Sequence, residues 1–143
     1  MDAKEVEVTA IKKKVVAVNS KLPKQDHWLP LSNLDLCIVR PLDFSLFFCY
    51  NKPTCKDNST CVAMVEVLKK ALEEALVPSY TLSSEVVLNS MGDPKLLCNK
   101  RGVDFIEAFA DTELQKLNLF KPDETIGCKL VPKKLNGVLA IQV

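Results

Sequence analysis

The chain has 143 residues, of which 48% are hydrophobic and 26% are charged, and its formal net charge is +1. We expect residues 1–143 to form one globular domain with a core of its own. No apolar run approaches the about 20 residues that a membrane helix needs. The small net charge provides no broad field for nucleic acid, so we expect neither a membrane nor a nucleic-acid partner.

The amino terminus and the cysteines favour a cytoplasmic protein. The first seven residues are polar and acidic, unlike a secretory signal. The six cysteines lack the two-residue spacing of a zinc knuckle, and the chain has a single histidine, so we expect no metal site. Cys55 and Cys61 bracket a polar loop and are a candidate disulfide pair, but buried free thiols suit this compartment better.

The first fifty residues predict strands separated by polar loops. Residues 5–18 alternate in part, which predicts one strand, or two short ones with the lysines at 12–14 as a solvated interruption. After a polar loop around Pro23, residues 27–30 lead into an apolar strand entry at 31–36. Residues 44–50 contain four aromatic side chains and predict a buried strand.

The clearest helix is predicted over residues 61–76, where apolar side chains recur at helical spacing. Ser59 or Thr60 is a candidate N-cap, and Pro78 stops the helix. On its outer face, Glu66 to Lys70 and Lys69 to Glu73 have the i,i+4 spacing of ion pairs. A strand is predicted next, over residues 80–87.

The stretch from 92 to 111 organises the carboxyl-terminal part of the chain. Residues 92–94 are a turn, 95–98 a short strand and 99–102 a second turn. Phe105, Ile106 and Phe109 lie on one side of a predicted helix start. A capping box at Thr112 predicts another short helix, and strands at 129–133 and 138–143 flank the hairpin turn Asn136-Gly137.

This stretch also carries a family resemblance. It reads Gly-Asp-Pro-Lys-Leu-Leu-Cys-Asn-Lys-Arg-Gly-Val-Asp-Phe-Ile-Glu-Ala from Gly92 to Ala108. It resembles the G-(E/D)-P-x-L-x-C-N-x-x-G-V-x-F-(I/V)-E-A segment in the amino-terminal half of plant BAHD acyltransferases. The resemblance implies an α/β (α+β) fold, a chloramphenicol acetyltransferase-like half-domain with a mixed sheet and flanking helices. It also implies transfer of an acyl group from acyl-CoA, a co-substrate rather than a bound cofactor, to an alcohol or amine.

Two further segments bear on the resemblance. The run from Tyr80 to Glu85 stands where the family has (Y/F)-P-L-A-G-R, with Glu85 in place of the usual arginine, as in the branch that acts on phenylpropanoid alcohols such as coniferyl alcohol. Residues 31–35 resemble the family's L-S-x-x-D segment, near the tunnel where the acceptor binds. This implies that Ser32, Asn33, Leu34 and Asp35 line or shape the acceptor site. The alternative is that Ser32 and Asp35 only cap or turn the backbone.

The chain lacks the family's catalytic residues. In the family, a His-x-x-x-Asp motif follows the strand equivalent to residues 138–143, and Asp-Phe-Gly-Trp-Gly lies near the carboxyl terminus. Neither motif occurs here, and His27 is followed four residues later by Leu31 rather than by aspartate. Acyl transfer requires a general base near the acceptor and donors for the oxyanion. We therefore expect no catalytic residue in this chain and read His27 as a loop histidine.

Three hypotheses remain open. The chain is part of an acyltransferase, paired with a carboxyl-terminal half that bears the catalytic histidine and with a small phenolic acceptor. Alternatively, it is a catalytically silent homologue that binds a ligand or dimerises through an uncovered strand or face. The third hypothesis is a plain α/β interaction domain.

Overall fold

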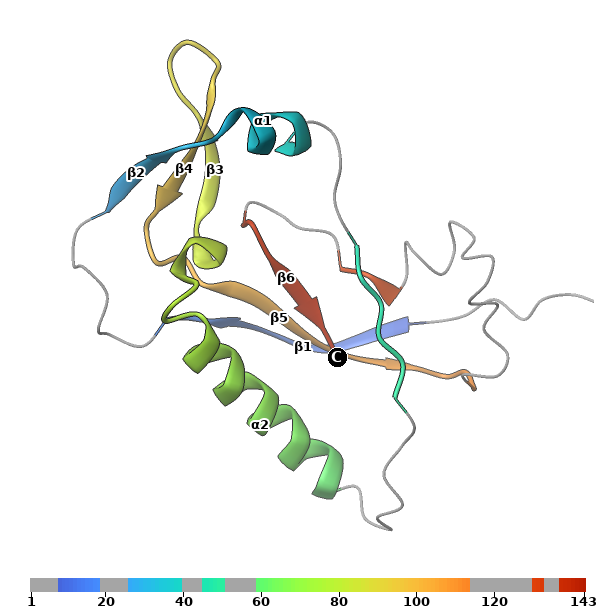
Figure 1. Ribbon diagram of the computed structural model, residues 1–143. Coiled ribbons are helices and arrows are strands. Elements are labelled where there is room, and N and C mark those ends of the chain that lie inside the picture. The colour runs from blue at the N-terminus through green and yellow to red at the C-terminus, as the bar shows by residue number, and fades with distance from the viewer. Residues whose placement is uncertain (1–7, 19–25, 40–44, 51–58, 114–129, 133–136) are drawn as a thin grey trace, which may run out of the picture.

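The computed structural model describes residues 8–18, 26–39, 45–50, 59–113, 130–132 and 137–143 (Figure 1). These residues form two three-stranded β-sheets with helices beside them. One sheet has the strand order β1-β5-β6 and mixes antiparallel with parallel pairing. The other has the order β2-β4-β3 and is antiparallel. The predicted combination of a mixed sheet with flanking helices is therefore confirmed.

The elements are short apart from two strands and one helix. The helices are α1 (Asn33–Val39), α2 (Ser59–Ala75) and the 3-10 turn η1 (Tyr80–Ser83), and the strands are β1 (Val8–Val16), β2 (His27–Pro30), β3 (Glu85–Leu88), β4 (Pro94–Cys98), β5 (Val103–Ala110) and β6 (Ala140–Gln142). Figure 1 shows α2 beside the sheet that contains β1 and β5, and α1 beside the end of β2.

The core lies between α2 and the β1-β5-β6 sheet. Leu76, just beyond α2, packs against buried side chains of the sheet, including Val103 and Phe105 of β5. Val65 and Leu72 of α2 add to this cluster from one face of the helix. The predicted helix is confirmed, but only part of its apolar stripe reaches the core.

The turn between β4 and β5 joins the two sheets. Its backbone has positive φ at Lys100 (56°) and at Gly102 (89°). A Cβ atom at Gly102 would lie 2.6 Å from the carbonyl oxygen of Val16, so only glycine fits beside the end of β1. The predicted turn at 99–102 is confirmed, as is the strand before it.

The predicted helix start after Gly102 is wrong, because residues 103–110 form β5. This strand pairs with β1 on one side and with β6 on the other. Its consecutive residues Val103, Asp104 and Phe105 are all buried, whereas Phe109 near its other end is 60% exposed. The helical spacing of Phe105, Ile106 and Phe109 is a coincidence within a short apolar run.

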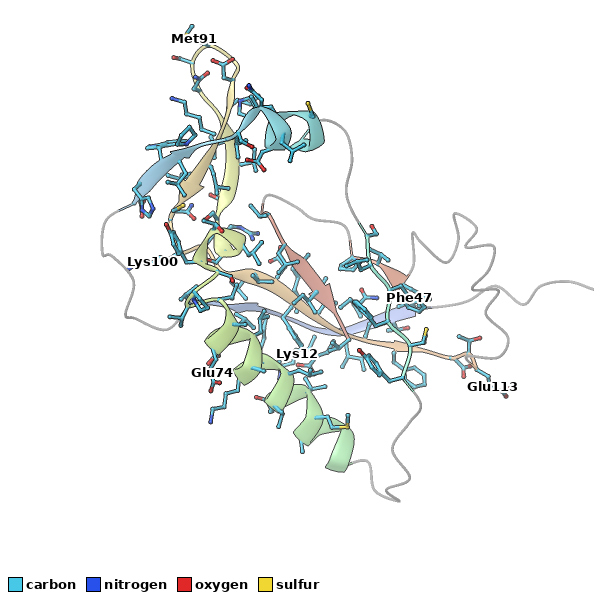
Figure 2. The ribbon with its side chains drawn as sticks, viewed as in Figure 1. Lys12, Phe47, Glu74, Met91, Lys100 and Glu113 are labelled. Atoms are coloured by element: carbon cyan, nitrogen blue, oxygen red, sulfur yellow. The ribbon has the colours of Figure 1, made fainter. Side chains whose placement is uncertain are left out.

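The predicted buried strand at 44–50 is also wrong for its described part. Residues 45–50 are exposed and form neither helix nor strand. Phe48 is 69% exposed and Tyr50 is 82% exposed, and Figure 2 shows Phe47 on the same irregular segment. Aromatic composition favours a strand only where another strand satisfies the backbone, and no strand pairs with this segment within the described residues.

The single strand predicted within residues 5–18 is confirmed for its described part, because β1 bulges between Ala10 and Lys12 and then continues through the lysines to Val16; the alternative of two short strands is wrong. Two other predictions need correction. The expected strand entry at 31–36 is instead the start of helix α1. The strand predicted from residue 80 begins only at Glu85, after the turn η1.

The carboxyl-terminal hairpin is corrected as well. Residues 130–132 form no strand, and β6 pairs parallel with β5 instead of returning antiparallel along residues 129–133. Gly137 makes an isolated antiparallel bridge with Glu85. Most of the helix predicted from Thr112 lies outside the described residues.

Cys37, Cys49 and Cys98 are free thiols, but they are not uniformly buried. Cys98 is buried, whereas Cys37 and Cys49 are exposed. The expectation of buried thiols therefore holds for Cys98 alone among these three. Cys55 lies outside the described residues, so the candidate pair with Cys61 is not tested.

Candidate functional site

Ser32, just before α1, and Asp35, in the first turn of α1, form a capping box. The Ser32 backbone N–H and side-chain hydroxyl donate to Asp35 Oδ2 at 2.9 Å and 2.7 Å, and the Asp35 N–H lies 3.2 Å from Ser32 Oγ. These side-chain and backbone hydrogen bonds from Ser32 lower the pKa of the Asp35 carboxyl. Two of the four predicted site residues thus fix the start of a helix.

The other two predicted site residues, Asn33 and Leu34, lie on the first turn of α1. Both are exposed, and 71% of the Leu34 surface is accessible. The capping box does not decide whether this segment also lines an acceptor site. That role stays a prediction for all four residues, and the adjacent cavity bears on it.

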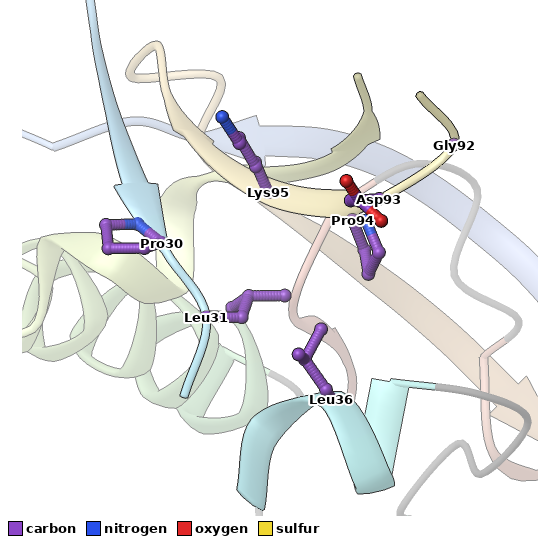
Figure 3. Close-up of a pocket in the computed structure, with 7 residues that line it drawn as sticks. All are labelled: Pro30, Leu31, Leu36, Gly92, Asp93, Pro94 and Lys95. Atoms are coloured by element: carbon purple, nitrogen blue, oxygen red, sulfur yellow. The ribbon is translucent and has the colours of Figure 1, made fainter. Parts of the chain in front are cut away.

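A cavity of about 480 Å³ lies beside α1 (Figure 3). It is lined by Leu31 and Leu36, which flank the capping box, by Pro30 of β2, and by the hairpin residues Gly92, Asp93, Pro94 and Lys95. In Figure 3, Leu31, Leu36 and Pro94 converge on the cavity, whereas the Lys95 ammonium points away from them. Its walls are therefore mainly apolar.

The pairing of β2 with β4 creates this cavity. Pro30 is the register partner of Lys95, which brings the start of α1 next to the β3–β4 hairpin. Asn89 holds the hairpin in shape, because its Oδ1 accepts the Asp93 N–H at 2.8 Å and its Nδ2 donates to Asp93 Oδ2 at 3.2 Å. Met91, at the tip of the same hairpin, points into solvent (Figure 2).

Sequence reasoning missed the residues that line the cavity. Leu31 and Leu36 are ordinary apolar residues, and the turn at 92–94 was identified only as a turn. No local signal shows that two segments about 60 residues apart meet, since strand pairing of this kind is a non-local choice.

The only histidine is a strand residue, contrary to the loop assignment. His27 opens β2, and its ring lies 5.7 Å from that of Tyr80, with 3.5 Å between Nε2 and the tyrosine oxygen. Both side chains are half-buried. Neither of them lines the cavity beside α1.

The described part of the chain offers no metal centre and no membrane span. Within it, no three histidine, cysteine, aspartate or glutamate side chains are grouped so that they could hold a metal ion. No helix among these residues combines the length and apolar character needed to cross a bilayer.

Comparisons with known proteins give a consistent result. Residues 6–143 match the profile of the Transferase family. The chain is 30% identical over 125 residues to putrescine hydroxycinnamoyltransferase 1 of Oryza sativa subsp. japonica; the aligned stretch covers 87% of this chain and 27% of that protein. It is 33% identical over 119 residues to a hydroxycinnamoyltransferase of Narcissus pseudonarcissus, where the alignment covers 83% of this chain and 26% of the relative. It is 36% identical over 106 residues to omega-hydroxypalmitate O-feruloyl transferase of Arabidopsis thaliana, where the alignment covers 71% of this chain and 21% of the relative. The chain spans about a quarter of the length of these curated relatives.

Proposed function

Since the chain belongs to the Transferase family of BAHD acyltransferases, we propose that it forms part of an enzyme that transfers an acyl group from acyl-CoA to an alcohol or amine. The observation that carries this proposal is the match of residues 6–143 to the family. The names of its relatives favour a hydroxycinnamoyl donor. We further propose that residues 1–143 are one cytoplasmic domain, equivalent to the amino-terminal, chloramphenicol acetyltransferase-like half of such an enzyme.

In this proposal the chain supplies one wall of the acceptor site. The cavity beside α1 supports this role, because apolar walls at Leu31, Leu36 and Pro94 suit the ring of a phenolic acceptor. The capping box of Ser32 and Asp35 fixes the direction in which α1 leaves the cavity. Asn33 and Leu34 extend the same wall.

The catalytic base is proposed to come from a carboxyl-terminal half. A base must take the proton from the acceptor as its oxygen or nitrogen attacks the thioester carbonyl, and the coenzyme A thiol leaves. In this chain, the ring of His27 is engaged with Tyr80 and does not line the cavity. The chain alone is therefore expected to be inactive.

A reconstitution assay tests the proposal. The purified chain is mixed with the separately expressed carboxyl-terminal half of the Oryza relative, and thiol release from coumaroyl-CoA is followed with putrescine or coniferyl alcohol as acceptor. Turnover in the mixture, and in neither component alone, is the expected result. No turnover, together with no complex on a sizing column, would contradict the proposal.

A second candidate function is a catalytically silent homologue that dimerises. The exposed apolar side chains favour it, including Leu46, Phe48 and Tyr50 of the irregular segment and Val62 and Val67 of α2. This alternative predicts a homodimer of the chain in sedimentation experiments at micromolar concentration. A monomer that binds the carboxyl-terminal half would exclude it.

A further inference from the structure

Arg101 lies where the two sheets meet and binds a carboxylate from each. Its Nε is 3.1 Å from Glu85 Oε1 at the start of β3, and its Nη2 is 3.1 Å from Asp104 Oδ2 in β5. All three side chains are largely buried, with exposed fractions of 20% for Arg101, 23% for Glu85 and 5% for Asp104. A guanidinium group is suited to this task because its fork of donors serves two acceptors at once.

The same two carboxylate residues are the backbone partners of the chain that enters β6. Glu85 forms the isolated bridge with Gly137, and Asp104 is the register partner of Ala140. Between these points, the Val138 N–H donates to the carbonyl of Ser84 at 3.1 Å. Arg101 therefore fixes the two side chains whose backbones hold the entry to β6 in place.

Gly137 lies against the third nitrogen of the guanidinium group, Nη1. Arg101 Nη1 is buried and has no hydrogen-bond partner among the described residues. A Cβ atom at Gly137 would lie only 2.6 Å from this nitrogen. Arg101 and any larger residue at position 137 cannot occupy these positions together.

Asn99 ties the turn to the same cluster. Its Nδ2 donates to Glu85 Oε2 at 2.6 Å, and its Oδ1 accepts the Arg101 N–H at 3.1 Å. Glu85 is thus held by two side chains of one turn. The arginine that is usual in the family at this position would instead face Arg101 with a like charge.

We propose that Arg101 is the positioning residue of β6: through Glu85 and Asp104 it sets where the chain enters this strand and keeps the strand in register with β5. The consequence for catalysis rests on the proposed function, in which the family's catalytic histidine follows this strand. Arg101 would then act through β6, without touching substrate. Its loss is expected to lower kcat of the reconstituted enzyme and to leave the acceptor KM unchanged.

Hydrogen exchange of the whole chain tests the structural part without any need for activity. In Arg101→Gln, the amides of Val138 and Val143 are expected to exchange at least roughly 10-fold faster, since hydrogen bonds to charged groups are lost beside them. The Leu76 amide, which donates to Leu72 at the end of α2, should keep its rate. Lys70→Gln, which removes an exposed cation from α2, is the matched control and should change none of these rates.

Gly137→Ala provides a second variant that leaves all the charges in place. Its added methyl group displaces the Arg101 guanidinium, so it should accelerate exchange of the Val138 and Val143 amides, which flank β6; it is also the variant to use where Arg101→Gln does not fold. Unchanged exchange of these two amides in both variants, or equal acceleration at Val138 and Leu76, would overturn the proposal. An absence of turnover after reconstitution would contradict the proposed function, and the exchange result would still decide the role of Arg101.

Discussion

The Lys69 ammonium group of α2 lies 2.5 Å from Oε1 of Glu107 in β5, and the lysine side chain is only 7% exposed. The same ammonium is 2.9 Å from Glu66 Oε1 and 5.5 Å from the centre of the Phe105 ring. The i,i+4 pair expected with Glu73 is therefore replaced by an i,i+3 pair and by a contact with another element. Lys69 attaches the polar edge of the helix to the central strand.

Removal of this cation should loosen α2. In Lys69→Ala, Glu107 stays partly buried without its partner, which is more damaging than the loss of an exposed ion pair. We expect a lower thermal midpoint than for Lys70→Ala, which truncates an exposed lysine one residue along the same helix. Circular dichroism melts of both variants measure the difference, and equal midpoints would contradict the role of the pair.

Stability should depend on pH through three groups. The hydrogen bond with Glu107, and then the one with Glu66, raise the pKa of Lys69, while Lys69 lowers the pKa of Glu66. A raised lysine pKa gives stability that is present below its ordinary value of 10.5 and is lost as pH rises through the raised value. The lowered pKa values of Glu66 and Asp35 give stability that is present above their ordinary values of 4.5 and 3.8 and is lost as pH falls.

The thermal midpoint is therefore expected to fall below pH 4.5 and again above pH 10.5. Glu66→Gln and Asp35→Asn each remove one group with a lowered pKa, so each should make the acid decline shallower. Melts over the acid range check this. A decline equally steep in the wild type and in both variants would show that other groups carry it.

Two glycines separate the effect of positive φ from the effect of close packing. Gly102 (89°) and Gly92 (82°) share a backbone conformation that disfavours other residues. A Cβ atom added at Gly102 would clash with the Val16 carbonyl oxygen, whereas a Cβ atom added at Gly92 would have no neighbour within 4 Å. Gly92→Ala should cost about 1–2 kcal/mol of unfolding free energy, and Gly102→Ala about 2–5 kcal/mol because the clash adds to the strain. Urea unfolding of the two variants measures both, and equal losses would refute the close approach of β1.

The sequence predicted turns and the long helix well because their signals are local. Gly92, Pro94, Gly102 and Pro78 act on the backbone within a few residues of themselves. The helix at 59–75 is likewise predicted by a local signal, the helical spacing of its own apolar residues. The structure confirms these features, and their ends differ from the predicted ones by only one or two residues.

Strand β5 shows why the predictions that depend on strand pairing failed. Its apolar residues fit a helix and a strand alike, and the choice was made by pairing with β1, almost ninety residues earlier, and with β6, about thirty residues later. The strand predicted for residues 44–50 is wrong in its described part for a related reason, because a strand-forming composition does not supply a partner strand. The cavity beside α1 depends on the same kind of pairing, between β2 and β4.

Two helical leucines test whether the cavity is the acceptor wall. Leu36 of α1 lines the cavity, whereas Leu68 of α2, which is similarly exposed (48% against 39%), does not line it. In the reconstituted enzyme, Leu36→Ala should raise the acceptor KM by about 3–10-fold, because apolar contact with the acceptor is lost. Its kcat should stay unchanged, since this contact is the same in the ground state and the transition state. Leu68→Ala is the control and should alter neither constant. Steady-state kinetics with coniferyl alcohol and with putrescine give both values. An equal change of KM in the two variants, or none in Leu36→Ala, would place the acceptor elsewhere.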